Sequence, residues 1–176
     1  LVDAGVIDKP WLFKLSARFL GQDRQLKAGE YVFSGDVSLY DAMEKIGNGD
    51  VFYRQITLAE GLTSKQMLQT LADELLLSGE MTLEAPEGSL LPETYSFVRN
   101  DTRNSIVARA QKSMNEALDA AWNNRQDGLP LKNKQELLIL ASIIEKETAI
   151  DSERRLVASV FVNRLRKGMK LQTDPT

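Results

Sequence analysis

The sequence contains no histidine and no cysteine among its 176 residues. Without histidine, Ser-His-Asp and Cys-His catalysis are excluded, and the commonest metal ligand is missing. Without cysteine, the chain has no disulfide, no thiolate nucleophile and no zinc ribbon. Such a composition is compatible with an oxidising compartment but does not require one. Any catalysis must therefore rest mainly on Asp or Glu, with Tyr, Ser, Thr, Lys and amide side chains in support.

Long apolar runs and an excess of positive charge are also missing. No stretch approaches the length of a membrane-spanning helix, and no signal peptide is visible. The chain has 22 Lys and Arg against 25 Asp and Glu, a net charge of -3, which argues against nucleic acid as a partner. The sequence begins at Leu1 without an initiator Met and ends in "QTDPT". We therefore expect it to be part of a longer protein, in which an anchor could precede Leu1.

Helix caps and alternation predict a small helix, strand and helix unit at the start of the chain. A first helix is expected from Asp8 to Gly21, because Asp caps helices and Gly ends them. The stretch "LKAGEYVFSG" alternates as a short strand does. A second helix is expected from an N-cap at Ser38 to Gly49. A partner strand for this small unit is expected outside the given sequence.

The remainder reads as a mostly helical part. A strand is expected at the start of "VFYRQI", and a helix is expected to begin at Thr63 or Ser64. A loop-rich stretch follows, and then helices over 100–124, 135–148 and 151–168. The helix over 135–148 is apolar nearly all round, which predicts that it is buried. Together these elements predict an α+β fold class.

Two glutamates close the apolar run "ASIIEKET". At about 100° per residue, Glu147 lies about 20° from Leu140 and about 40° from Ile143, whereas Glu145 lies about 160° from Glu147. Desolvation on an apolar stripe raises a carboxyl pKa and prepares the group to act as a general acid. The alternative is that both glutamates sit at a solvated helix end, and from the residues alone this is the simpler interpretation.

Polar residues in two other stretches are candidates for ligand contacts. Glu93 and Tyr95 in "LLPETYSF" combine a carboxylate with an aromatic ring, which suits carbohydrate. The alternative is a polar loop with Tyr95 in the core. In "LQTDPT", the residues Gln172, Thr173 and Asp174 either face a cleft or form a plain turn.

One amide stands within an otherwise apolar helix face. Asn163 follows three apolar residues in "SVFVNRL". It is either a buried structural amide or a ligand contact, and the pattern does not separate the two.

Four ordered blocks, "LLPETYSF", "LASIIEKET", "VASVFVNRL" and "LQTDPT", resemble the signature of the MltG/YceG family of endolytic murein transglycosylases. The stretches "LKAGEYVF" and "ITLAEGLTSKQM" resemble the LysM-like region of that family, so the resemblance runs through the whole chain. It implies a LysM-like α/β module over 1–52 and a mostly helical, lysozyme-like catalytic domain over 53–176, whose remaining C-terminal part is absent. It also implies a single-pass anchor in the bacterial inner membrane, with this region in the periplasm.

The resemblance further implies a reaction and a catalytic residue. Family members cleave the β-1,4 bond between N-acetylmuramic acid and N-acetylglucosamine within a glycan strand, leave a 1,6-anhydro end, and need no cofactor or metal. Goose-lysozyme-like transglycosylases carry their catalytic glutamate at a helix end before a small hydroxyl residue. Glu147-Thr148 matches this pattern and Glu145-Lys146 does not, and the adjacent Lys favours an ionised Glu145. We therefore expect Glu147 to be the acid and base and Glu145 to support it. The expected glycan contacts are Glu93, Tyr95, Thr148, Asn163, Gln172, Thr173 and Asp174.

The expected partners are peptidoglycan glycan strands and cell-wall synthases such as the penicillin-binding proteins. Cleavage within a nascent strand would terminate its elongation. Two alternatives remain from the sequence: a non-catalytic peptidoglycan-binding module that recruits synthases, and a purely structural helical domain of an envelope complex.

Overall fold

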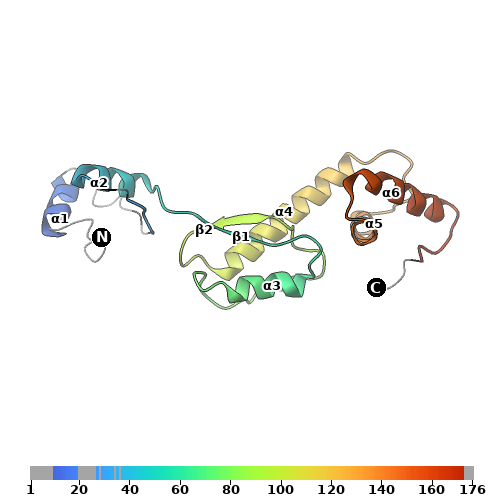
Figure 1. Ribbon diagram of the computed structural model, residues 1–176, viewed down its shortest axis with the longest axis horizontal. Coiled ribbons are helices and arrows are strands. Elements are labelled where there is room, and N and C mark those ends of the chain that lie inside the picture. Colours follow the sequence, from blue (N-terminus) through green and yellow to red (C-terminus); the bar gives the residue numbers. More distant parts are fainter. Residues whose placement is uncertain (1–9, 20–26, 28, 34, 36, 173–176) are drawn as a thin grey trace.

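The computed structural model describes residues 10–19, 27, 29–33, 35 and 37–172, and its elements form an elongated molecule (Figure 1). At one end lie α1 (Pro10–Phe19) and α2 (Leu39–Asn48). The middle holds the strands β1 (Arg54–Thr57) and β2 (Thr94–Phe97) with α3 (Ser64–Asp73). From there α4 (Arg103–Asn123) extends toward α5 (Lys134–Glu147) and α6 (Asp151–Arg166) at the other end. The predicted α+β class is confirmed. None of the helices in the described ranges is both long and apolar enough to cross a membrane.

A two-stranded antiparallel sheet organises the central core. Ile56 of β1 lies opposite Tyr95 of β2, and Tyr95 and Phe97 alternate with exposed residues along β2. The sequence predicted a loop here, and β2 is too short for its alternation to stand out against the polar residues before it. The helices α3 and α4 pack around the sheet. The buried core consists of Ile56, Leu58, Met67, Leu71, Leu77, Leu90, Tyr95, Phe97, Ile106, Val107 and Ala110.

Side-chain caps set the helix starts that the sequence predicted. The Ser38 hydroxyl accepts from the Asp41 N–H, and Gly49 ends α2 in the left-handed region at φ 73°. Thr63 forms a capping box with Gln66 at the start of α3. The helix α3 ends at Asp73, and Leu75 beyond it is 91% exposed. The ends predicted for the first helix, Asp8 and Gly21, lie outside the described residues.

The segment before α2 is not the predicted strand. Residues 29–33 follow an irregular path, and the backbone bond found there joins the Phe52 N–H to the Glu30 carbonyl at 2.7 Å. A strand needs a ladder of such bonds to a neighbour, and the described residues 29–33 show only this one. The Glu30 carboxylate instead binds Arg54 at 3.0 Å and Arg99 at 2.8 Å, which ties the segment to the sheet. The domain boundary near residue 52 stays a prediction.

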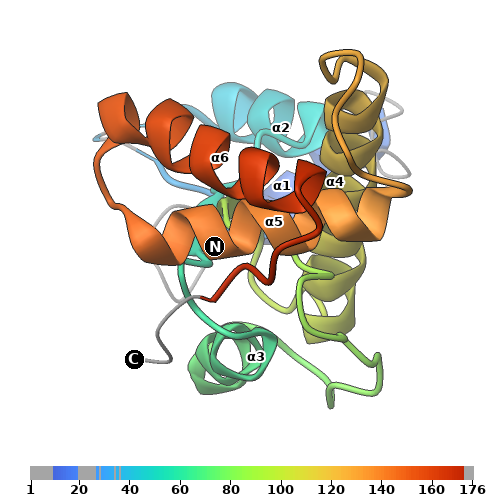
Figure 2. The same ribbon diagram turned by 90° about the vertical axis from the view of Figure 1, so that its right-hand side faces the viewer.

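The helix α5 is less buried than predicted. Leu140 is its one buried residue in the described structure, while Ile139 is 49% exposed. Figure 2 shows α6 lying along one side of α5, with α4 at its first turns. These two neighbours cover part of the circumference. An all-round apolar pattern reports what a helix is able to bury, whereas actual burial also needs covering elements on every side.

Candidate active site

The candidate site lies where α5 ends and α6 begins. Asn133 caps the start of α5 by accepting from the Glu136 N–H, and Thr148 ends the helix in an extended conformation. The Thr148 N–H still donates to the Ile144 carbonyl at 3.2 Å, so the last turn is closed. The first turn of α6 carries acidic residues, which suit the positive end of a helix dipole. We call this turn, residues 145–154, the α5–α6 corner.

Glu145 is held in an ion pair across the corner. Its Oε2 lies 3.1 Å from Arg154 Nη2, and its Oε1 accepts from the same nitrogen at 3.3 Å. Arg154 Nη1 also contacts Asp151 at 3.0 Å. The two partners in the Glu145–Arg154 pair are about equally exposed, at 37% and 39%. Glu145 therefore has a structural contact that links the two helices.

Glu147 is exposed. Within the described ranges, its carboxylate has neither a hydrogen bond nor an ion pair to another residue. The sequence placed Glu147 on an apolar stripe with Leu140, where burial was expected; Leu140 is buried, but Glu147 in the last turn is exposed. Glu147 is therefore free to meet a ligand from solvent.

The four residues at the end of α5 have different surroundings. Glu145 binds α6 through Arg154, and Lys146 Nζ donates to the Gly61 carbonyl at 3.2 Å in the turn between β1 and α3. The Thr148 hydroxyl donates to Glu153 at 3.1 Å. Two of these four side chains thus bind the first turn of α6, and a third binds the turn between β1 and α3.

The Lys146 contact also relates the corner to Glu93. The Leu58 N–H donates to the Glu93 carbonyl at 3.0 Å, and Leu58 is three residues before Gly61. Three residues span at most about 10 Å. Glu93, whose side chain is exposed, thus lies in the same region of the molecule as the end of α5.

The loop before Glu93 is fixed by contacts to three helices. The Glu87 carboxylate accepts from the Ser64 N–H at 3.0 Å at the start of α3, and the Leu91 N–H donates to the Ala110 carbonyl of α4 at 3.2 Å. Gly88 has φ +74°, and a Cβ there would lie 3.0 Å from Leu138 Cδ2 of α5. Only glycine adopts this conformation readily at so close an approach. The loop therefore packs against α3, α4 and α5.

Tyr95 belongs to the core. It is 6% exposed, and its hydroxyl donates to the Leu91 carbonyl at 2.8 Å. Burial, and secondarily the negative charge of Glu93, raise the pKa of the Tyr95 hydroxyl. This geometry favours the alternative that the sequence left open, a tyrosine packed in the core, and gives no support to a sugar contact.

The remaining predicted contacts are distributed along α6 and beyond. Asn163 is exposed, so the alternative of a buried structural amide is wrong. It lies twelve residues after Asp151, about 18 Å along the helix from the corner. Gln172 is exposed and has a positive φ of 47°. Thr173 and Asp174 lie outside the described residues. Among the predicted residues, Thr148 thus lies beside Glu147 in the corner, and Asn163 lies further along α6.

Sequence reasoning missed the residues that build the corner. Glu153 and Arg154 look like ordinary charges in the first turn of a helix, and Lys146 looks like a solvated one. Their partners lie on other elements, so these pairs become visible only in the folded structure. In the described part of the chain, no three acidic side chains gather as a metal site would require.

Comparison with known proteins gives consistent matches. The sequence profile of the YceG-like family matches residues 1–176. The endolytic murein transglycosylase of Bacillus subtilis (strain 168) is 30% identical over 184 residues, covering 85% of this chain and 50% of that protein. The endolytic murein transglycosylase of Streptococcus pneumoniae (strain D39) is 27% identical over 220 residues, covering 99% of this chain and 39% of that protein. The chain thus spans half or less of the length of these relatives.

A solved structure also matches. The crystal structure of a YceG-like protein from Listeria monocytogenes gives a TM-score of 0.50 at 24% identity, covering 99% of this chain and 67% of that one. This likeness concerns the fold alone.

Proposed function

The chain belongs to the YceG-like family, and we propose that it is part of a lytic transglycosylase that cuts within peptidoglycan glycan strands. The relatives named endolytic murein transglycosylases support this reaction class. The observation that carries the assignment of the acid is the contrast between the two glutamates of α5. Glu145 is paired with Arg154, whereas Glu147 is exposed and its carboxylate forms no hydrogen bond or ion pair with a described residue.

In the proposed reaction, Glu147 transfers its proton to the oxygen of the β-1,4 bond between N-acetylmuramic acid and N-acetylglucosamine. The bond from the muramyl C1 to that oxygen breaks, and the N-acetylglucosamine part leaves with a new 4-hydroxyl. The muramyl C6 hydroxyl oxygen then bonds to C1, and its proton returns to the Glu147 carboxylate. The products are a 1,6-anhydro-N-acetylmuramic acid end and a shortened strand, and no water is consumed.

One carboxyl is enough for both proton transfers. The leaving oxygen departs from the β face of the muramyl ring, and the 1,6-anhydro bridge forms on that same face. Glycosidases that use water commonly need a second carboxyl to activate it or to attack C1. Here the substrate supplies its own nucleophile. This chemistry fits a chain without histidine, in which Glu145 is committed to an ion pair.

An exposed Glu147 also fits cleavage inside a strand. A long polymer must lie across the residue, so the residue cannot be enclosed on all sides. A bound glycan would cover the carboxyl and exclude water, which favours the protonated form that the first step needs. Glu93 and Gln172, both exposed, remain the proposed glycan contacts among the described residues.

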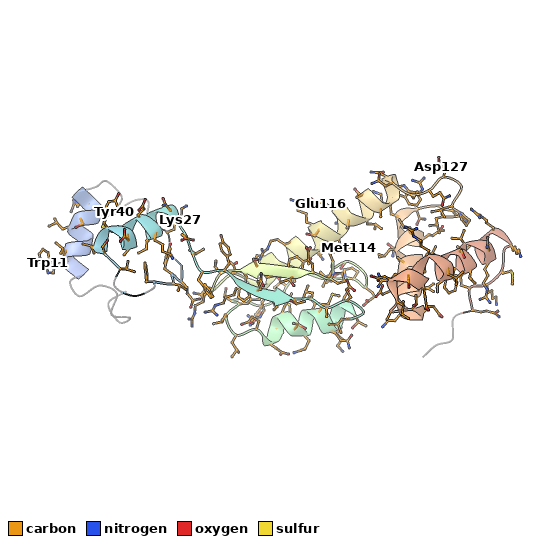
Figure 3. The ribbon with its side chains drawn as sticks, turned by 45° about the horizontal axis from the view of Figure 1, so that its top comes forward. Trp11, Lys27, Tyr40, Met114, Glu116 and Asp127 are labelled. Atoms are coloured by element: carbon orange, nitrogen blue, oxygen red, sulfur yellow. The ribbon has the colours of Figure 1, made fainter. Side chains whose placement is uncertain are left out.

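The substrate places the protein at the bacterial envelope. We place this region in the periplasm, attached to the inner membrane through a part of the protein outside this chain. Cutting a nascent strand would end its elongation, and cell-wall synthases are the partners that this role implies. The LysM-like module over 1–52 would give the strand a second contact, at the end of the molecule where Figure 3 labels Trp11 and Tyr40.

The test uses the full-length protein with Glu147→Gln and, as the matched control, Glu145→Gln. Purified glycan strands are digested, and anhydro-ended products are counted by mass spectrometry. We expect Glu147→Gln to lower the rate by at least about 100-fold, because it removes the acid and base. Glu145→Gln should lower it less, because the amide oxygen still accepts from Arg154. Both variants should bind glycan strands as the parent does.

Two outcomes would count against the proposal. Full activity of Glu147→Gln with loss in Glu145→Gln would reverse the assignment. No anhydro-ended products from the parent itself, together with normal glycan binding, would support the alternative of a non-catalytic module that recruits synthases.

A further inference from the structure

The hydroxyl of Thr148 is buried and fully used within the protein. Thr148 is 7% exposed, and its Oγ1 donates to Glu153 Oε2 at 3.1 Å. The same oxygen accepts from the Ile150 N–H at 3.1 Å. A buried hydroxyl that already donates and accepts has little left to offer a ligand. A glycan contact by Thr148, as the sequence predicted, is therefore not favoured by its geometry.

The bond from the Ile150 N–H ties Thr148 to the start of α6. The structure places Ile150 at the N-cap of α6, and Ile150 has no capping side chain. Thr148, two residues before Ile150, supplies the oxygen that accepts from the Ile150 N–H. A single hydroxyl thus joins the C-terminal cap of α5 to the entry of α6.

The contacts of the corner lie on both sides of Glu147. Glu153 and Arg154 are consecutive residues of α6, and they bind Thr148 and Glu145 respectively. Thr148, directly after Glu147, and Glu145, two residues before it, are therefore both fixed to the same turn of α6. Helix ends fray unless such contacts hold them.

We propose that Thr148 and Glu153 are positioning residues that fix the direction of the Glu147 carboxyl. This inference rests on the proposed function of Glu147. The hydroxyl-carboxylate bond holds the Thr148 peptide and thereby the last turn of α5, from which Glu147 projects. Proton transfer requires the acid to lie within hydrogen-bonding reach of the glycosidic oxygen. A small rotation of this turn is enough to take it out of reach.

The test compares Thr148→Val with Thr148→Ser in the full-length enzyme. Valine keeps the shape and loses the hydroxyl, whereas serine keeps the hydroxyl. We expect Thr148→Val to lower kcat by about 10- to 100-fold with little change in KM, because misplacement by about 1 Å has effects of this size. Thr148→Ser should restore most of kcat. Hydrogen exchange of the Ile150 amide should become faster in the valine variant and remain slow in the serine variant.

Glu153→Ala and Glu153→Gln provide a second pair in case valine at position 148 prevents folding. Glu153 is exposed, so neither change empties the core. The alanine variant loses the acceptor and should lower kcat, while the glutamine variant keeps an acceptor oxygen and should be close to the parent.

Three results would overturn the proposal. One is an unchanged kcat in Thr148→Val despite fast Ile150 exchange, because the turn would then have loosened without consequence. Another is a rise in KM alone, which would make Thr148 a substrate contact. The third is full activity of Glu147→Gln, which overturns the proposed function itself. This failure is distinguishable because the Ile150 amide still exchanges slowly in that variant.

Discussion

Replacing Arg103 by methionine should destabilise the central part of the molecule. Arg103 begins α4, and its guanidinium donates four hydrogen bonds to backbone carbonyls around the end of α3. The acceptors are Leu71 at 3.0 Å, Ala72 at 3.2 Å, Glu74 at 2.8 Å and Gly79 at 2.9 Å. The last carbonyls of a helix have no partner within it, and the helix dipole favours a cation beside them.

The size of the effect follows from these four bonds. A hydrogen bond to a charged group contributes about 1.5–3 kcal/mol when it stands alone. The four share one cation, and the bond to Gly79 is at the surface, so their sum is well below four times that value. We expect Arg103→Met to lower the free energy of unfolding by about 3 kcal/mol. For a chain of this length, this corresponds to a fall in Tm of about 6–12 °C.

Urea unfolding followed by circular dichroism measures the change directly, with Arg109→Met as the matched control. Arg109 lies on the same helix, is exposed, and donates one bond to the Ser96 carbonyl at 2.7 Å. Its removal should cost less than about 1 kcal/mol. The urea midpoint should shift in Arg103→Met at an unchanged m value. Equal midpoints for the two variants would refute the reasoning, because the four-fold carbonyl contact would then contribute nothing beyond a surface bond.

Two further predictions concern the Glu30 contact and the Gly88 loop. Hydrogen bonds from Arg99 and, secondly, from Arg54 lower the pKa of Glu30 from its ordinary value of 4.5. The contact therefore stabilises the fold at pH values above 4.5, where Glu30 is ionised in both states. This stabilisation is lost as the pH falls through the lowered pKa of the folded state. An NMR titration should place the Glu30 midpoint below 4.5, and replacing both arginines by methionine should return it toward 4.5; a midpoint that stays low would contradict this cause. Gly88→Ala should cost about 1–2 kcal/mol from its positive φ, plus a further loss from contact with Leu138. Gly79 has φ +72° with nothing within 4 Å, so Gly79→Ala should show only the cost of the positive φ in thermal unfolding. Equal losses of stability in the two variants would mean that the contact with Leu138 contributes nothing.

Local signals predicted much of this fold because helix ends are local structures. Ser38 and Thr63 cap the helices that they were expected to cap, since a cap joins residues only two or three apart. The capping box of Thr63 with Gln66 is readable from spacing alone. Gly49 ends α2 for an equally local reason, its left-handed conformation.

Features that depend on distant partners were not predictable in this way. The strand β2 forms because β1 (Arg54–Thr57) lies beside it. The paired residues are 37 to 43 positions apart in the sequence, from Thr57–Thr94 to Arg54–Phe97. The stretch at 29–33 has the alternation of a strand, but in the described structure it forms one backbone bond to Phe52 and no ladder. Alternation states which face a segment would bury, and pairing decides whether it becomes a strand.

The choice between the two glutamates stays a prediction, and the property on which the sequence based it is not the one that the structure shows. The sequence favoured Glu147 because its stripe promised burial, yet the structure leaves Glu147 exposed. What separates the residues is their partners. Arg154 engages Glu145, Gly61 engages Lys146 and Glu153 engages Thr148. These contacts restrict the backbone around Glu147 without engaging its carboxyl, so the residue is held in place and yet remains available. Because the described residues leave it exposed, we propose that the water exclusion a general acid needs comes from the bound strand, which would tie proton transfer to the presence of substrate.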